Sequence, residues 1–318
     1  MRLVEALNRG LQAKKENGPF NDNGSNGYGK KSDMSKIKVA ELFYSLQGEG
    51  QYLGTPSVFL RVFGCNFQCA GFSMPRGQLS EERLAVDPNL YSRYDDLPLV
   101  HTGCDSYASW DARFKHLSPM LQVSAIVDRM QELLPGGKFG NDKHLILTGG
   151  EPLLGWQRAY IDLFNEIGKR DMNLTHITFE TNGTQPLREE LKEWFVSNDY
   201  FPWLDITFSV SSKLPSSGEA WEDAIKPEII QEYYAYSSSV YFKWVVSNQE
   251  DYEDIVKAVD TYSKVCDIES IPIYLMPAGG TTMHYDSNEK WVADLAMKNG
   301  WRYTPRLQVQ LWKNAWGT

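Results

Sequence analysis

The chain has 318 residues, 42% of them hydrophobic and 23% charged, and carries a formal net charge of −9. No apolar run approaches the roughly 20 residues that a membrane-spanning helix needs, and no basic segment followed by an apolar one suggests secretion, so we expect a cytoplasmic protein. The negative charge argues against direct, tight binding of nucleic acid, which requires clustered Lys and Arg.

The first part of the chain has the composition of an appendage. Residues 1–35 are rich in Gly, Asn, Ser and Lys and lack apolar periodicity beyond a short amphipathic pattern over residues 1–11, which predicts a flexible segment. We expect one domain over residues 36–318. It begins with two strands, over residues 39–45 and 56–63, joined by a Gly-rich turn.

A long polar stretch, residues 70–103, follows the second strand. It has room for a short helix but shows no strong core pattern. Connections of this length without secondary structure are uncommon in compact domains, and they are usually functional or disordered. We therefore expect one of these two roles for the stretch.

Beyond residue 140 the chain alternates between β-rich and helical patterns. Crossovers of this length predict an α/β fold with a parallel sheet or an α/β barrel. The expected strands cover residues 144–148, 175–180, 205–210, 240–246 and 272–277, and the clearest helical patterns cover residues 155–170, 187–198 and 249–265.

Unusual residues follow these strands directly. They are Thr148-Gly-Gly-Glu-Pro152, Glu180-Thr-Asn-Gly183, Ser211-Ser-Lys213 and Met276-Pro277. In parallel α/β folds, ligands gather at the carboxyl ends of the strands. We therefore expect these segments to face one rim and to form a binding site, although each polar group is also compatible with a simple strand-end cap.

Four cysteines in a chain without secretion signals favour metal binding or burial over disulfides. Cys65 and Cys69 lie in FGCNFQCAGF, directly after the second strand. Two thiols four residues apart can converge on one metal from a loop, and they are also compatible with buried core positions. Cys266 lies far from the other motifs and is expected to be structural.

Five segments favour metal binding over simple burial for Cys65 and Cys69. In chain order they are FYSLQGEGQYLGTPSVFLRVFGCN, LTGGEPLL, FETNGT, FSVSSK and RLQVQLW. Together they closely resemble the 7-carboxy-7-deazaguanine synthases of the radical S-adenosylmethionine (SAM) superfamily, from about residue 37 to the last residues. The resemblance implies an incomplete parallel (β/α) barrel. It also implies a [4Fe–4S] cluster, SAM and Mg²⁺ as cofactors, and contraction of 6-carboxy-5,6,7,8-tetrahydropterin to 7-carboxy-7-deazaguanine with loss of ammonia.

The chain departs from the superfamily pattern CxxxCxxC, because Phe72 stands where the third cysteine is expected. The family often continues that cysteine into Asp-Thr, and this chain has Cys104-Asp105-Ser106. We infer that residues 70–103 are an insertion in the cluster loop and that Cys104 is the third ligand. Three thiolates would leave one iron open for SAM, whereas four would complete the cluster.

The resemblance implies further site residues. For SAM they are Gly149, Gly150, Glu151, Glu180, Thr181, Asn182, Ser211 and Lys213, with the Glu151 carboxylate and the neighbouring backbone expected to accept hydrogen bonds from the SAM ammonium. For the pterin they are Gln47, Gly48, Glu49, Arg61 and Asp105. Arg61 suits a carboxylate through its fork of donors, although a strand-exposed ion pair is the alternative. Ser106, in the place of the usual Thr, is expected to bind Mg²⁺.

Some interpretations stay open. Gln308 stands where the family commonly has His, so a titrating group is lost there, and His284 is a candidate to reach the site. An electron donor such as flavodoxin and a homodimer are expected from the resemblance. The insertion is a candidate lid, dimer contact or docking surface for the reductant. The alternatives for function are another radical SAM reaction, such as activation of a glycyl-radical enzyme, and a catalytically inactive metal-binding homologue.

Overall fold

The computed structural model describes residues 35–279 and 288–318. The expected flexibility of residues 1–34, the short helix over residues 1–11 and the position of His284 lie outside these ranges. No helix within them is long and apolar enough to cross a membrane.

A single mixed sheet organises the described residues. Its strands are β1 (Lys36–Leu46), β2 (Pro56–Val62), β3 (Met120–Gln122), β4 (His144–Gly149), β5 (His176–Thr181), β6 (Asp205–Val210), β7 (Ser239–Val246), β8 (Ile273–Pro277) and β9 (Arg302–Tyr303). The order is β3-β1-β2-β4-β5-β6-β7-β8-β9. Strands β2 and β4 to β9 are parallel, whereas β1 pairs antiparallel with both β2 and β3. The sheet curves without closing, which confirms the incomplete barrel.

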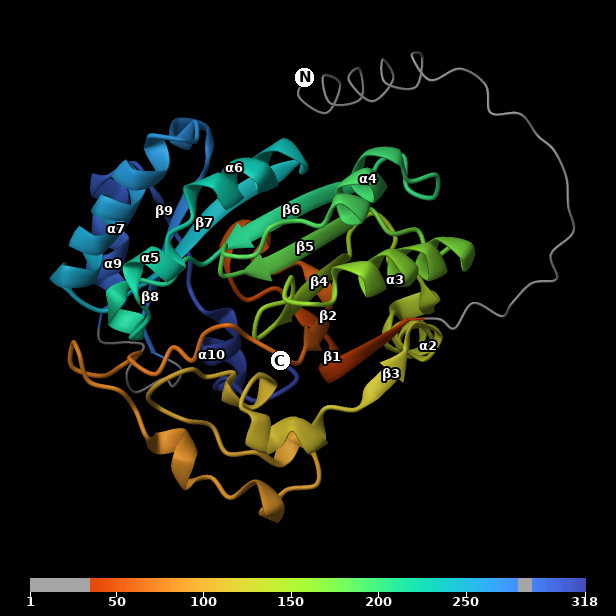
Figure 1. The fold of residues 1–318 in the computed structure, drawn as a ribbon, viewed down its shortest axis with the longest axis horizontal. Helices are drawn as coiled ribbons and strands as arrows, with labels where there is room; N and C mark the ends of the chain where they lie inside the picture. The colour runs from red at the N-terminus through yellow and green to blue at the C-terminus, as the bar shows by residue number, and fades with distance from the viewer. Residues whose placement is uncertain (1–34, 280–287) are drawn as a thin grey trace, which may run out of the picture.

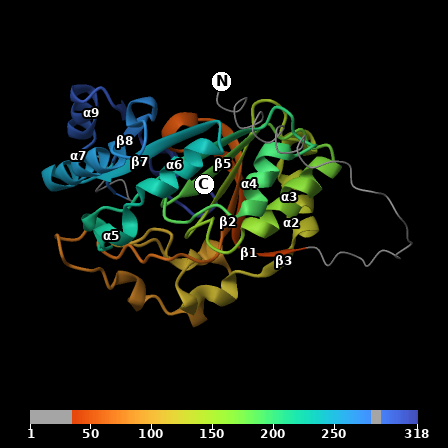
Figure 2. The same cartoon turned by 45° about the horizontal axis from the view of Figure 1, so that its top comes forward.

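Helices cover the outer face of this sheet (Figures 1 and 2). They are α2 (Val123–Leu133), α3 (Gln157–Lys169), α4 (Glu189–Ser197), α6 (Pro227–Ala235), α7 (Gln249–Ser263) and α9 (Glu289–Lys298). Two further helices lie at the carboxyl ends of the strands: α5 (Trp221–Ala224), which packs on the cysteine loop through Ala224, and α10 (Leu307–Trp312), which lines the pocket through Gln308. The helical patterns at residues 155–170, 187–198 and 249–265 correspond to α3, α4 and α7.

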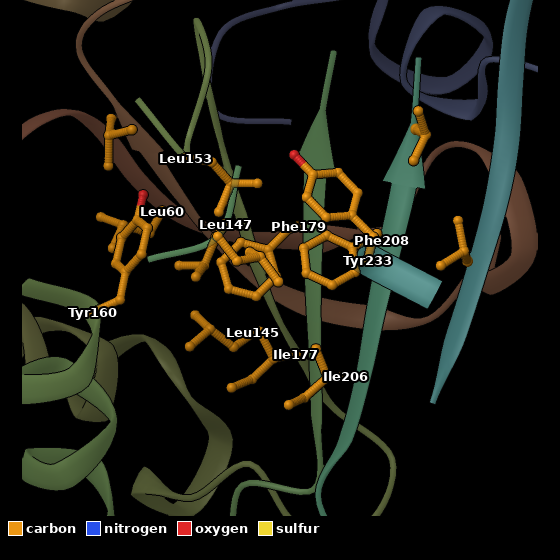
Figure 3. Packing of buried hydrophobic residues seen from close by; sticks show 14 of the residues in the cluster. Leu60, Leu145, Leu147, Leu153, Tyr160, Ile177, Phe179, Ile206, Phe208 and Tyr233 are labelled. Atoms are coloured by element: carbon orange, nitrogen blue, oxygen red, sulfur yellow. The ribbon is translucent and has the colours of Figure 1, made fainter. Parts of the chain in front are cut away.

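Alternation along the strands separates an apolar outer face from a polar inner face. Leu145, Ile177, Phe179 and Phe208 are fully or almost fully buried against the helices, as Figure 3 shows. The residues between them point to the other face, because successive side chains of a strand alternate. The inner positions are more polar, and they include Thr148, Glu180, Ser209 and Lys243.

Aromatic rings close the amino-terminal end of the inner face. The rings of His144 and His176 stack with centroids 4.3 Å apart and an angle of 2°, and the Tyr52 ring meets His144 edge-on at 4.4 Å. The Tyr52 hydroxyl hydrogen-bonds Thr207 Oγ1 at 3.0 Å. The inner face is therefore blocked at this end, and ligands have access at the carboxyl ends of the strands.

The insertion, residues 70–103, has short 3₁₀ turns at Glu82–Ala85, Pro88–Leu90 and Tyr94–Asp96. It also contributes to a second hydrophobic core, made of Ala40, Tyr94, Leu97, Val100, Tyr107, Ala108, Phe114 and Leu117. The stretch therefore buries apolar side chains although its sequence shows no strong core pattern. Its apolar residues are spaced irregularly along a chain that is neither helix nor strand, so no period of 2 or 3.6 reveals them.

Candidate functional site

A pocket opens at the carboxyl ends of the parallel strands. All but one of the predicted site residues line it: Gln47, Gly48, Glu49, Arg61, Cys65, Cys69, Cys104, Asp105, Ser106, Gly149, Gly150, Glu180, Thr181, Asn182, Ser211 and Lys213. Parallel strands end at one edge of their sheet, so the loops that follow them meet there. Glu151 is the exception, because its side chain is fully buried behind the pocket wall.

The cysteine loop follows β2 and is held by backbone hydrogen bonds. Glu219 Oε1 accepts from the N–H groups of Gln68 and Cys69, at 2.8 and 2.7 Å. Cys69 has φ of 50°, a left-handed conformation that is uncommon for a residue with a side chain. With these constraints, Cys65 and Cys69 face the pocket together with Cys104, and Phe67 and Phe72 pack around them.

The three thiols influence one another, which indicates that they lie close together. Burial raises the pKa of Cys65 to about 12 and that of Cys69 well above its usual range. The neighbouring thiols add to both shifts, while Lys213 opposes them. A buried thiolate therefore requires positive charge nearby, which iron would supply.

Within the described residues, no three His, Cys, Asp or Glu side chains are arranged to hold a single metal ion. Three cysteine thiolates are a ligand set typical of an iron–sulfur cluster, in which each thiolate binds a different iron. Cys266 lies elsewhere, where its thiol donates to the carbonyl of Pro227 at 3.5 Å.

The turn after β4 lets the backbone approach the cysteine loop. A Cβ atom on Gly150 would lie 2.6 Å from Cys65 Cβ and would also overlap the carbonyl oxygen of Gly64. Gly150 must therefore be glycine for the cysteine loop to keep its position.

Glu151 ties this turn to the end of β5. Its carboxylate accepts hydrogen bonds from the Leu153 N–H at 3.0 Å, the Thr181 hydroxyl at 2.8 Å and the Asn182 N–H at 2.7 Å. Burial raises the pKa of Glu151 to about 7, against the effect of these hydrogen bonds. The structure therefore gives the Glu151 carboxylate a buried role between two loops rather than a place on the pocket wall, so it does not bring the carboxylate to where SAM is expected.

Two further contacts join the strand ends to the cysteine loop. Asn182 Nδ2 donates to Asn66 Oδ1 at 2.9 Å, so the end of β5 holds the segment between the first two cysteines. Lys213 Nζ donates to Ser211 Oγ at 3.2 Å and lies 5.8 Å from the centre of the Phe72 ring. Phe72, which replaces the expected cysteine, therefore packs against a predicted SAM residue.

A charged network with Glu49 at its centre also lines the pocket, and Lys243 of this network lies 3.8 Å from Glu180 Oε1 at the end of β5. Lys243 Nζ lies 2.6 Å from Glu49 Oε2, and Arg306 Nε and Gln308 Nε2 donate to Glu49 Oε1 at 3.1 and 2.6 Å. Burial alone would raise the pKa of Glu49, but these cations and hydrogen bonds outweigh it and lower the pKa to about 2. Glu49 is therefore ionised at neutral pH.

Arg306 also connects Glu49 with Asp105, the residue that follows Cys104. Its Nη2 donates to Asp105 Oδ2 at 2.7 Å, and although burial acts the other way, the guanidinium keeps the pKa of Asp105 below its usual value. Arg306 thus holds two predicted substrate residues from different segments.

Arg61 belongs to a second, separate ion pair. Its Nε donates to Glu41 Oε2 at 2.7 Å, and its Nη1 donates to Ser106 Oγ at 3.3 Å. Ser106 Oγ also lies 3.3 Å from Asp105 Oδ1. The ion pair of Arg61 is largely buried rather than strand-exposed, and Arg61 also lines the pocket, so binding of a carboxylate stays a prediction.

The sequence reasoning missed Glu41 and Lys243 and assigned no role to Arg306. A signal exists for Lys243, since it is a lysine within the apolar strand VYFKWVV, where a buried charge requires a partner. Arg306 was visible in the RLQVQLW segment. Glu41 gives no signal, because an acidic residue in a two-residue alternation is typical of a solvent-facing strand position.

Similarity to known proteins agrees with this geometry. No family model matches the chain. The 7-carboxy-7-deazaguanine synthase of Halobacterium salinarum is 30% identical over 291 residues, covering 89% of this chain and 93% of that protein. The enzyme of the same name from Pyrobaculum aerophilum is 29% identical, covering 90% and 99%. The crystal structure of QueE from Escherichia coli matches with a TM-score of 0.50 and 17% identity, covering 86% of this chain and 94% of that one, which supports the fold.

Proposed function

The chain belongs to the 7-carboxy-7-deazaguanine synthase family, and on this premise we propose that the pocket at the strand ends binds a [4Fe–4S] cluster, SAM and 6-carboxy-5,6,7,8-tetrahydropterin side by side. The protein is a radical SAM lyase that contracts this pterin to 7-carboxy-7-deazaguanine with loss of ammonia. One observation carries the proposal: the three cysteines, the glycine turn and the charged network line a single pocket, although they come from segments far apart in the sequence.

The cysteine triad fits the cluster. Cys65, Cys69 and Cys104 would hold three irons and leave the fourth for SAM. When bound, the cluster and SAM supply the radical that removes hydrogen from the substrate. The protein's part is to exclude water from the thiols, which Phe67 and Phe72 do by packing around them.

The SAM side is assigned to the strand ends. Gly149 and Gly150 expose backbone to the pocket, and Glu180, Thr181, Asn182, Ser211 and Lys213 add polar side chains to it. Glu151 acts behind this wall by holding the Thr181–Asn182 backbone in place.

The substrate side is assigned to the charged network. Ionised Glu49 can accept hydrogen bonds from a guanine-like edge, and Gln47 and Gln308 can accept or donate. Both Gln47 and Gln308 line the pocket beside Glu49. Arg61 is proposed to bind the substrate carboxylate, and Asp105 to orient it.

Mg²⁺ is proposed to bind at Ser106. Its hydroxyl lines the pocket beside Asp105 Oδ1. Mg²⁺ commonly keeps several waters and uses one or two protein oxygens, so this sparse set suits it.

The reductant is proposed to reach the cluster from outside the cysteine loop. Cys65 also lines a second, more open pocket, together with Gln68, Arg83, Trp110 and Arg113. A one-electron donor such as flavodoxin could approach through this opening. A homodimer and a cytoplasmic location complete the proposal.

The experiment is an anaerobic assay with reconstituted protein, SAM, dithionite and 6-carboxytetrahydropterin, with products identified by mass spectrometry. We expect 7-carboxy-7-deazaguanine, ammonia and 5′-deoxyadenosine. Cleavage of SAM with the pterin left intact would overturn the substrate and favour a different radical SAM reaction. A protein that binds iron but cleaves no SAM would favour an inactive homologue.

A further inference from the structure

The insertion is connected to the substrate side of the pocket by one side chain, Trp316. Its ring meets the rings of Tyr94 and Tyr107 edge-on, with centroids 4.9 and 6.2 Å away. Its Nε1 donates to the carbonyl of Leu97 at 2.8 Å. Tyr94 and Leu97 belong to the insertion, so the insertion's core binds residues from the far end of the described chain (Figure 1).

The chain must bend sharply to place Trp316 there. Lys313 and Asn314, directly after α10, have φ of 55° and 59°. Two successive non-glycine residues in the left-handed region are unfavourable, on the order of 1 kcal/mol each, and persist only where surrounding contacts stabilise them. The contacts of Trp316 with Tyr94 and Leu97 provide this stabilisation. Residues 314–318 then form part of the pocket wall.

The next residue joins this segment to Arg61. The Gly317 N–H donates to Glu41 Oε1 at 3.0 Å, while Glu41 Oε2 accepts from Arg61 Nε at 2.7 Å. Glu41 is only 7% exposed, so each of its oxygens depends on these partners. One carboxylate therefore connects the segment that Trp316 anchors with the guanidinium proposed to bind the substrate carboxylate.

We propose that the insertion positions Arg61 for the substrate carboxylate, acting through Trp316, Gly317 and Glu41. This inference rests on the proposed function, since it assigns the insertion a part in pterin binding. Trp316, Tyr94 and Glu41 are positioning residues. The part of the insertion that contacts Trp316 acts on the carboxylate end of the substrate, whereas Phe72, at the start of the insertion, packs against Lys213, which is assigned to SAM.

The test compares two probes on the cluster-loaded protein with SAM present. Dissociation constants of 6-carboxypterin and of pterin, which lacks the carboxylate, are measured anaerobically by ultrafiltration, and their ratio gives the carboxylate selectivity. We expect Trp316→Ala to lower this selectivity about tenfold, the effect of one poorly placed charged hydrogen bond. The dissociation constant of SAM should stay unchanged.

Matched variants separate positioning from general packing. Tyr94→Ala should reproduce the loss, and the double variant should be no worse than either single one, because the two residues act through one contact. Trp203→Ala removes a tryptophan that is 85% exposed, and as the control it should have no effect.

Three outcomes would overturn the inference. They are unchanged selectivity in Trp316→Ala, equal weakening of both pterins and SAM, and additive losses in the double variant. If Trp316→Ala does not fold, Trp316→Phe is measured instead, because it keeps a ring and removes the hydrogen bond to the Leu97 carbonyl. Carboxylate selectivity equal to wild type in Trp316→Phe would then count against a positioning role for Trp316. A wild-type protein without preference for 6-carboxypterin and without product would instead overturn the proposed function.

Discussion

Lys243 Nζ lies 2.6 Å from Glu49 Oε2, although the two residues are 194 positions apart. Both side chains are almost buried, at 7% and 12% exposure. Glu49 precedes the second strand of the sheet and Lys243 lies in β7, so the pair joins distant parts of the barrel across the pocket. Lys243 therefore keeps Glu49 ionised, and the ion pair also fixes the position of the Glu49 side chain in the pocket.

Removing Lys243 should destabilise the protein and weaken pterin binding. Lys243→Met leaves Glu49 buried with only Arg306 as a cationic partner, and breaking one side of a buried ion pair costs about 3 kcal/mol. Urea unfolding of the cluster-free protein measures this loss. The double variant Glu49→Gln/Lys243→Met should recover part of it, because no buried charge is then left unpaired. Unchanged stability of Lys243→Met would contradict the importance of this pair.

The stacked histidines should make stability depend on pH. Burial, together with the charge of His176, lowers the pKa of His144 to about 4 from 6.5. The unfolded chain therefore binds more protons than the folded one between these values, and stability falls as the pH drops from about 6.5 to 4. The loss attributable to His144 is about 3 kcal/mol.

His144→Phe keeps a ring against His176 and removes the titrating group, so its urea midpoint should change less across this pH range. His116→Gln, at an exposed position, is the matched control and should follow wild type. Parallel pH profiles for wild type and His144→Phe would contradict the prediction.

Gly150→Ala should displace the cysteine loop. The added Cβ would overlap Gly64 and lie 2.6 Å from Cys65 Cβ, so we expect a loss of about 1–3 kcal/mol in stability and a clear drop in bound iron. Gly155→Ala is the control in the same connection. Gly155 has φ of 84° but nothing near its Cβ position, so this variant should lose some stability and keep its iron. Equal iron content in both variants would contradict the close approach.

Strand ends explain why so much of the site could be predicted. The apolar runs ending in Gly149, Thr181 and Val210 locate three strands, and parallel strands bring the residues that follow them to one edge. The pocket contains the predicted groups for this reason. The resemblance supplied the pairing of Cys104 with Cys65 and Cys69, which spacing alone does not reveal because residues 70–103 intervene.

The remaining features depend on long-range contacts that no periodicity encodes. Strands β3 and β9 have only three and two residues, too short for a pattern. Glu151 looked like a ligand residue because of its motif, but its place behind the pocket wall follows from the tight turn after β4. The insertion's core depends on Trp316, which is far away in sequence. The contribution of Glu41 and Lys243 is likewise visible only when distant strands are brought together.

The most direct test of the account counts iron, sulfide and product in three proteins: wild type, Cys104→Ala and Cys266→Ala. Each is purified and reconstituted anaerobically and then incubated with SAM, the pterin substrate and dithionite. The account predicts about four irons per chain and 7-carboxy-7-deazaguanine from wild type and Cys266→Ala, with both lost in Cys104→Ala. A Cys104→Ala protein that keeps its cluster and its activity would show that the third ligand has been wrongly assigned.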